Sequence, residues 1–139
     1  MILQTITRKS KKKKSYLKKE DYSLSLAISA CRGAEEKKGE NILLLDVSRL
    51  TIVSDYFLFI TAKSSAQINA IANYIEEMLT KTNHPSVSKE GLIESNWIIL
   101  DFGELVVHIM NEEIRNFYQL ERFWSNGRKV KSNIWKKDL

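Results

Sequence analysis

The chain has 139 residues, 43% of them hydrophobic, with one proline and five glycines, a composition typical of one compact domain. It has no apolar run long enough to span a membrane, and the start of the chain lacks the apolar segment of a secretory signal. The single cysteine, Cys31, excludes disulfide scaffolds and cysteine-rich metal sites. We therefore expect one domain in a reducing compartment.

Charge is segregated along the chain. Residues 1–20 carry eight Lys or Arg against one Glu, and residues 125–139 carry five against one Asp. Residues 21–124 carry nine Lys or Arg against fifteen Asp or Glu, so a basic leader and a basic C-terminal tail flank an acidic body. A body that binds RNA by itself should be basic. The pattern therefore favours a protein surface as the main partner, with electrostatic attraction added by the ends.

The leader contains the run Lys11, Lys12, Lys13 and Lys14. Blocks of like charge usually stay solvated and flexible. Three interpretations stay open: a solubilising tail, an arm that contacts rRNA phosphates, and the transit peptide of an organelle. The leader is short and rich in Lys rather than in Ser and Arg, which counts against the transit peptide.

The first elements of the body are a helix and two strands. Apolar residues at helical spacing predict a helix over residues 22–38, ended by a cationic last turn and Gly39. Cys31 falls in this apolar stripe, which indicates a core residue rather than a nucleophile. Residues 42–47 and 56–61 are short, continuously apolar runs typical of strands buried on both faces.

A second helix follows. Ser64 and Gln67 have the spacing of a capping box, and an apolar stripe at helical spacing continues from them. Pro85 cannot continue a helix and marks its end. Residues 86–96 are polar and are predicted to be a loop, with a short edge strand near Val87 as an alternative.

The sequence from residue 97 onward predicts a hairpin and a helix. Residues 97–102 and 105–110 are strand-like, with a tight turn between them. Asn111 is a suitable N-cap for one final helix, made amphipathic by Ile114, Phe117, Tyr118 and Trp124. The order α-β-β-α-β-β-α predicts a single α/β (α+β) domain: a mixed β-sheet with flanking helices.

The residues offer little for catalysis. His108 lies in an apolar strand, where a structural histidine is favoured over a catalytic base, and His84 precedes a proline in a loop. Neither has a second ligand at metal-binding spacing. Asp101-Phe102-Gly103 matches the metal-binding triplet of protein kinases, but the chain has no other kinase motif, and Asp before Gly is a common turn residue.

The acidic side chains of the final helix, Glu112, Glu113 and Glu121, could form a metal cluster. Cap charges and a solvated helix face explain them more simply. The sequence therefore predicts a protein without catalytic residues, metal or cofactor.

One segment is far more specific than the rest. Residues 97–124 read WIILDFGELVVHIMNEEIRNFYQLERFW. This resembles the signature of the RsfS/Iojap family of ribosomal silencing factors: W, three hydrophobic residues, D-x-G, an acid, VHI, then EE-x-R-x-x-Y-x-LE, a cation, a hydrophobic residue and W. Shorter upstream matches extend the resemblance over residues 22–124.

The resemblance implies a function that composition does not show. Family members bind a ribosomal protein on the inter-subunit face of the large ribosomal subunit, block association with the small subunit and so repress translation. It also implies a nucleotidyltransferase-like fold, homodimers in some members, and a bacterial cytoplasm, with an organelle as the alternative. Two other functions stay open: an enzyme of nucleotidyltransferase type, and a basic RNA-binding module in ribosome biogenesis. The first lacks the carboxylate pair that would hold its metal ions.

Carried onto this sequence, the resemblance implies that the ribosomal protein is contacted by one strand face and one helix stripe: Trp97, Ile99 and Asp101 on the strand, and Arg115, Tyr118 and Arg122 on the helix. Trp97 is the expected interface anchor. Two alternatives remain: Trp97 only caps the core, and Tyr118 pins the helix to the sheet.

Overall fold

The computed structural model describes residues 16–136, and side chains from Tyr22 onward. Lys11 to Lys14 lie outside the described residues. In chain order the elements are α2 (Tyr16–Glu36), β1 (Glu40–Asp46), β2 (Tyr56–Thr61), α3 (Ser65–Lys81), β3 (Ser88–Leu92), β4 (Trp97–Asp101), β5 (Leu105–Met110), α4 (Glu112–Tyr118), α5 (Leu120–Phe123), β6 (Arg128–Lys129) and the 3-10 helix η2 (Ser132–Ile134).

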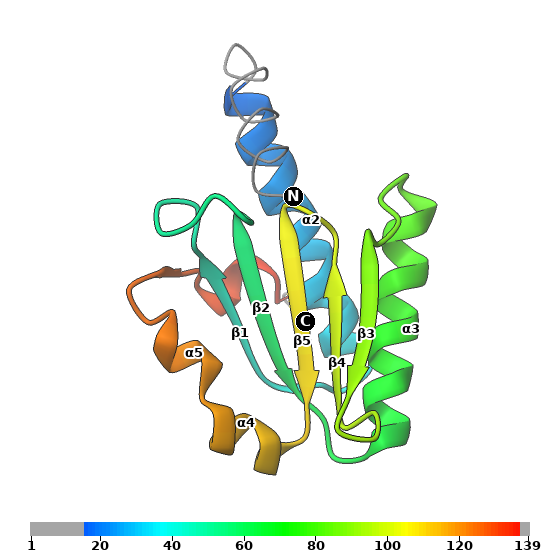
Figure 1. Cartoon of the computed structure of the whole chain (residues 1–139). Helices are drawn as coiled ribbons and strands as arrows, with labels where there is room; N and C mark the ends of the chain where they lie inside the picture. Colours follow the sequence, from blue (N-terminus) through cyan, green and yellow to red (C-terminus); the bar gives the residue numbers. More distant parts are fainter. Residues whose placement is uncertain (1–15, 137–139) are drawn as a thin grey trace.

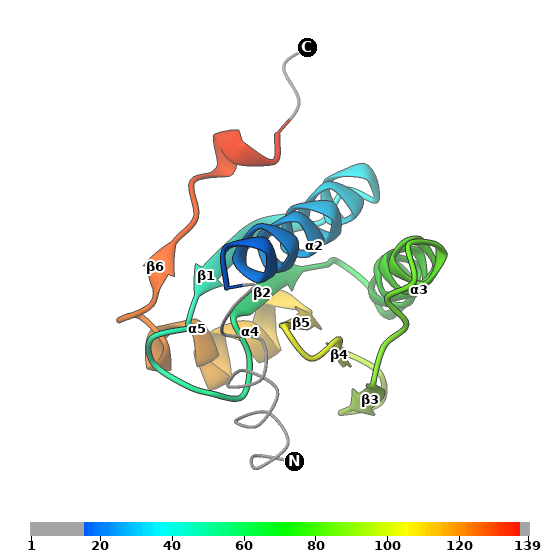
Figure 2. The ribbon, with the colours of Figure 1, turned by 90° about the horizontal axis from the view of Figure 1, so that it is seen from above.

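The strands form one mixed sheet in the order β3-β4-β5-β2-β1-β6. Figure 1 labels the first five of these strands, and Figure 2 labels β6 beside β1. β2 and β5 run parallel, while every other neighbouring pair is antiparallel. All six residues of β2 are buried, as its continuously apolar sequence predicted. The prediction of a single α+β domain with a mixed sheet and flanking helices is confirmed.

The two faces of the sheet are covered differently. α2 and α3 lie together on one face, and α4 and α5 lie on the other (Figure 2). Side chains alternate between the faces along each strand. On β4, Ile98 and Leu100 join the core under α2 and α3, whereas Trp97 and Ile99 belong to the cluster on the opposite face.

Local sequence signals form the junctions around α3. Ser64 caps this helix, because its hydroxyl accepts a 3.1 Å hydrogen bond from the Gln67 amide, which confirms the predicted cap. The Gln67 side chain also donates to the carbonyl oxygens of Lys37 and Lys38. Lys38, rather than Gly39, takes the left-handed conformation at the end of α2 (φ 63°). A Cβ on Gly39 would lie 2.7 Å from Ile60 Cγ2, so close packing requires glycine there.

Two predicted elements differ from the structure. The single final helix is two short helices, because Gln119 between α4 and α5 adopts a left-handed conformation (φ 48°, ψ 47°). The segment predicted as a loop contains β3, in agreement with the alternative of a short edge strand near Val87, and β3 pairs with β4 along its whole length. Every residue of β3 is exposed, so this edge strand lacks the apolar pattern by which strands are recognised.

Residues 125–136, which we call the C-terminal strap, pack on the body of the domain. β6 pairs with β1, and the Val130 amide donates to the Leu44 carbonyl at 2.9 Å. Trp135 is 2% exposed and belongs to the core under α2, and Arg32 Nε donates to its carbonyl oxygen at 3.1 Å. The sequence analysis treated residues 125–139 as a tail; over 125–136 the structure instead places them on the folded domain.

Candidate protein-binding surface

A continuous chain of ring contacts crosses the sheet face opposite α2 and α3. Neighbouring ring centroids lie between 4.8 and 6.5 Å apart, within the range of favourable aromatic pairs. We call the seven residues of this chain the aromatic surface; in order along it they are Phe123, Trp124, Phe57, His108, Trp97, Tyr118 and Phe117.

The aromatic surface is buried in its middle and open at its ends. Phe57 and Trp97 are buried. Phe117 is 80% exposed, Phe123 79% and Tyr118 46%. Exposed aromatic side chains on a rigid support are typical of surfaces that bind another macromolecule. The exposed ends therefore indicate where a partner would contact the domain.

Trp97 lies beneath Tyr118 rather than at the outer surface. The two ring centroids are 5.1 Å apart, and Trp97 is only 9% exposed. Its indole Nε1 donates a 3.2 Å hydrogen bond to Nδ1 of His108. This geometry favours a supporting role for Trp97 and makes Tyr118 the accessible ring of the pair.

His108 is a neutral ring held between aromatic neighbours. It stacks on Phe59 with a centroid distance of 5.2 Å and an interplanar angle of 12°. Burial lowers the pKa of His108 to about 4, against the smaller opposing effect of the Glu121 carboxylate. Because Nδ1 accepts from the Trp97 indole, the proton of the neutral imidazole resides on Nε2. His108 thus supports the surface as a hydrogen-bond acceptor.

The lowered pKa of His108 predicts a pH-dependent stability. The unfolded chain takes up this proton near pH 6.5, whereas the folded chain does so only at about 4. The contribution of neutral His108 to the free energy of unfolding is therefore fully present above about pH 6.5 and is lost as the pH falls toward about 4. Between about pH 7 and about pH 5 we expect a loss of about 2 kcal/mol, measured by urea unfolding followed by circular dichroism.

The control is His108→Gln, whose amide oxygen can accept the Trp97 hydrogen bond and does not titrate. It should remove most of this pH dependence, leaving the part due to other groups. An equal pH dependence in both proteins would contradict the assignment.

Arg115 ties α4 to the sheet and is buried. Its Nε donates to the Glu121 carboxylate at 3.0 Å. Its Nη1 donates to the Asn41 carbonyl at 2.7 Å and to the Thr61 hydroxyl at 2.8 Å. The guanidinium therefore joins α4, α5 and the ends of two strands, and its bonds leave it engaged within the domain.

The remaining predicted site residues take different positions. Ile99 is half-buried and pairs with His108 in the β4–β5 ladder, which places it beside the ring chain. Asp101 accepts a 2.8 Å hydrogen bond from the Gly103 amide in the hairpin turn. Arg122 is exposed, and its guanidinium contacts Gln119. The predicted stripe of Arg115, Tyr118 and Arg122 does not form, because the backbone breaks at Gln119 between α4 and α5.

Two exposed rings were absent from the predicted site. Phe117 was expected on the buried face of an amphipathic helix, but it is exposed because α4 contacts the sheet through Ile114 and Arg115. Phe123 lies in the short helix α5, which has no buried residue. The available signal was the density of aromatic residues near the end of the 97–124 motif: Phe117, Tyr118, Phe123 and Trp124.

Two candidate nucleophiles and the possible metal ligands among the described residues bear on catalysis. No group of three or more His, Cys, Asp or Glu side chains among them could hold a metal ion. Burial raises the pKa of the Cys31 thiol well above its ordinary value, which disfavours the reactive thiolate. Ser64 is committed to the cap of α3.

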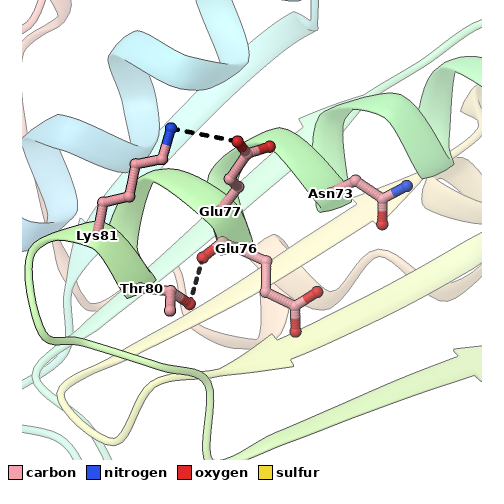
Figure 3. A pocket seen from close by; sticks show the side chains of 5 residues that line it. All are labelled: Asn73, Glu76, Glu77, Thr80 and Lys81. Carbon is pink, nitrogen blue, oxygen red and sulfur yellow. Dashed lines mark hydrogen bonds and ion pairs between the residues drawn. The ribbon is translucent and has the colours of Figure 1, made fainter.

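A surface hollow lies along the outer side of α3, lined by Asn73, Glu76, Glu77, Thr80 and Lys81 (Figure 3). Its side chains satisfy one another locally: Lys81 pairs with Glu77 at 3.2 Å, and the Thr80 hydroxyl donates to the Glu76 carbonyl at 2.7 Å. No helix in the described part of the chain is long and apolar enough to cross a membrane.

The fold and the aromatic surface define a small α+β domain that presents rings on one face of a mixed sheet. Residues 20–138 match the family model described as ribosomal silencing factor during starvation, RsfS. The chain therefore belongs to the RsfS family, as its 97–124 segment indicated, and its general role is that of a ribosomal silencing factor.

Individual relatives agree with this membership. The ribosomal silencing factor RsfS of Bacillus subtilis is 34% identical over 104 residues, covering 75% of this chain and 86% of that protein. The chloroplastic Iojap protein of Zea mays is 36% identical, over 77% of this chain and 46% of its own length. A mouse protein named mitochondrial assembly of ribosomal large subunit protein 1 is 27% identical, over 75% and 46% respectively.

A solved structure shares the fold. The crystal structure of a Chromobacterium violaceum protein superimposes with a TM-score of 0.71 at 30% sequence identity, covering 78% of this chain and 89% of that one.

Proposed function

We propose that this protein represses translation by binding the large ribosomal subunit through its aromatic surface, on the face where the small subunit docks. The observation that supports this most directly is the exposure of Phe117, Tyr118 and Phe123 at the ends of a ring chain built on a sheet. The name of the mouse relative, which refers to the large ribosomal subunit, agrees with the choice of subunit.

Steric exclusion is sufficient for this function and needs no catalytic group. The rings are held by the sheet and by one another, so little conformational freedom is lost on binding. A ribosomal protein with an apolar patch is the proposed partner. The proposed setting is a bacterial cytoplasm.

A second copy of the chain would find the same exposed rings. A homodimer formed on the aromatic surface would compete with the subunit, because both would bury the same side chains. Binding should therefore be measured over a range of protein concentrations, with the oligomeric state recorded in parallel.

The test is co-sedimentation with purified ribosomal subunits, together with a subunit-joining assay. We expect the wild-type protein to sediment with large subunits and to lower joining in proportion to its occupancy. Tyr118→Ala should weaken binding by about 2 kcal/mol if the ring is an interface hot spot, with a matching loss of inhibition. Equal sedimentation with small subunits would contradict the proposal.

Tyr22→Ala is the matched control. Tyr22 is 48% exposed, close to the 46% of Tyr118, but it lies on α2, on the other side of the sheet, where it contacts His84. Its removal should leave binding unchanged. Equal losses in the two variants would mean that the aromatic surface is not the contact.

A further inference from the structure

The C-terminal strap is a basic edge on an acidic domain. Residues 125–136 contain four Lys or Arg and no Asp or Glu. All four cations, Arg128, Lys129, Lys131 and Lys136, are exposed. The strap is therefore positively charged, whereas residues 21–124 carry more acidic than basic residues.

Most of these cations have no counterion in the described part of the chain. The side chains of Arg128, Lys129 and Lys131 form no ion pair or hydrogen bond with another described residue. Lys136 has one acidic neighbour, Glu35, at 4.0 Å. Their charge is therefore available to an outside anion.

The strap is held in place, so these charges are arranged rather than free. Arg128 and Lys129 pair with Asp46 and Leu45 of β1, and Trp135 is buried in the core. Because strand side chains alternate, Lys129 lies on the same sheet face as Leu45, the face of the aromatic surface. Arg128 points to the opposite side of the sheet edge.

An exposed ring adjoins this charge. Phe123 precedes the strap, is 79% exposed and forms one end of the aromatic surface through its contact with Trp124. Surfaces for nucleic acid combine cations that follow the phosphate backbone with rings on which bases stack. Protection of a sheet edge by charge is the simpler explanation, but β6 has only two residues, and the cations continue beyond it through Lys131 and Lys136.

We propose that the C-terminal strap is a second binding surface, which contacts the phosphate backbone of RNA beside the protein contact made by the aromatic surface. The inference rests on the proposed function in naming ribosomal RNA as that RNA. Because Lys129 and the rings share a face, one docking event can engage a ribosomal protein and the neighbouring rRNA together.

The test compares two triple variants of the full chain with equal charge change. In the strap variant, Arg128, Lys129 and Lys131 are replaced by Gln; in the control variant, Lys63, Lys81 and Lys89, which lie elsewhere on the surface, are replaced by Gln. Binding to a fluorescently labelled RNA hairpin is measured as a function of salt. Each lost phosphate contact lowers the slope of log affinity against log salt by roughly 0.7 to 0.9.

We expect the strap variant to lower the slope by about 2 and to weaken RNA binding at least about tenfold at low salt. It should also release large subunits at lower salt than wild type does. The control variant should match the wild type, and any RNA binding by the lysines of the leader is common to all three proteins. Equal slopes in the two variants would overturn the proposal.

Two further measurements distinguish RNA from other anionic partners, and a failure of the strap proposal from a failure of the proposed function. Polyglutamate and anionic lipid vesicles serve as competitors: displacement of the strap-dependent binding by either one as effectively as by unlabelled RNA would assign the strap to acidic proteins or membranes instead. Tyr118→Ala should keep hairpin binding while losing the large subunit. A lowered hairpin slope in the strap variant, with an unchanged hairpin slope in Tyr118→Ala, therefore tests the strap separately from the aromatic surface.

Discussion

Replacing Arg115 with alanine should destabilise the domain by about 3 kcal/mol, because it leaves the Glu121 carboxylate without its partner in a partly buried site. The substitution also removes the hydrogen bonds to the Asn41 carbonyl and the Thr61 hydroxyl. Glu121 Oε2 already lacks a partner among the described residues, so a second unpaired oxygen there is poorly tolerated. Urea unfolding followed by circular dichroism measures the loss.

Arg122→Ala is the control for this prediction. Arg122 carries the same charge in the neighbouring helix but is exposed, so its loss should change the free energy of unfolding by less than about 0.5 kcal/mol. The double variant Arg115→Met with Glu121→Leu removes both charges and should recover at least about 1 kcal/mol relative to Arg115→Ala. If Arg115→Ala were as stable as Arg122→Ala, the network would not hold α4 on the sheet.

Trp135→Ala should be about as damaging, with an expected loss of about 3 kcal/mol or more. Trp135 is 2% exposed and lies with α2 and the sheet in the main core. Truncation leaves a large cavity and releases the end of the strap, including the bond from Arg32 to the Trp135 carbonyl. The loss is read from the midpoint of urea unfolding at an unchanged slope with denaturant.

Ile134→Ala tests whether the effect belongs to the buried ring. Ile134 precedes Trp135 and is 46% exposed, so its truncation should change stability by no more than about 0.5 kcal/mol. A native-like midpoint for Trp135→Ala would show that the strap contributes little to folding. The cations of the strap would then not be held in a fixed arrangement on the domain, which would contradict the proposed RNA contact.

The two predictions separate stability from binding. Arg115 was expected at the partner interface, yet its contacts lie inside the domain. A binding defect in Arg115→Ala would therefore be interpreted only after its stability is known. Tyr118, in contrast, is accessible, and its truncation tests binding directly.

Interactions between near neighbours could be predicted from the sequence. The caps at Ser64 and Asn111 formed as expected, because each joins residues three positions apart. The apolar runs at residues 56–61, 97–102 and 105–110 became strands, since burial on a sheet follows directly from their composition. The resemblance to the family likewise depended on one long local motif.

Contacts between distant residues could not be predicted. Trp97 was expected as an interface anchor, with a core cap as the alternative; the choice between them depends on Tyr118 and His108, which reach Trp97 only through the sheet and α4. The role of Arg115 depends on Asn41 and Thr61, far away in the chain. No local pattern encodes which partner a side chain meets across the fold.

The ends of the chain show most clearly which properties the sequence predicts and which only the tertiary structure decides. By sequence alone, the segregation of charge was evident, and with it the acidic body between basic ends. Only the tertiary structure placed residues 125–136 against β1 with Trp135 in the core. Charge is a property of composition and is read directly, whereas burial depends on the complementary surface that α2 and the sheet provide after they have folded.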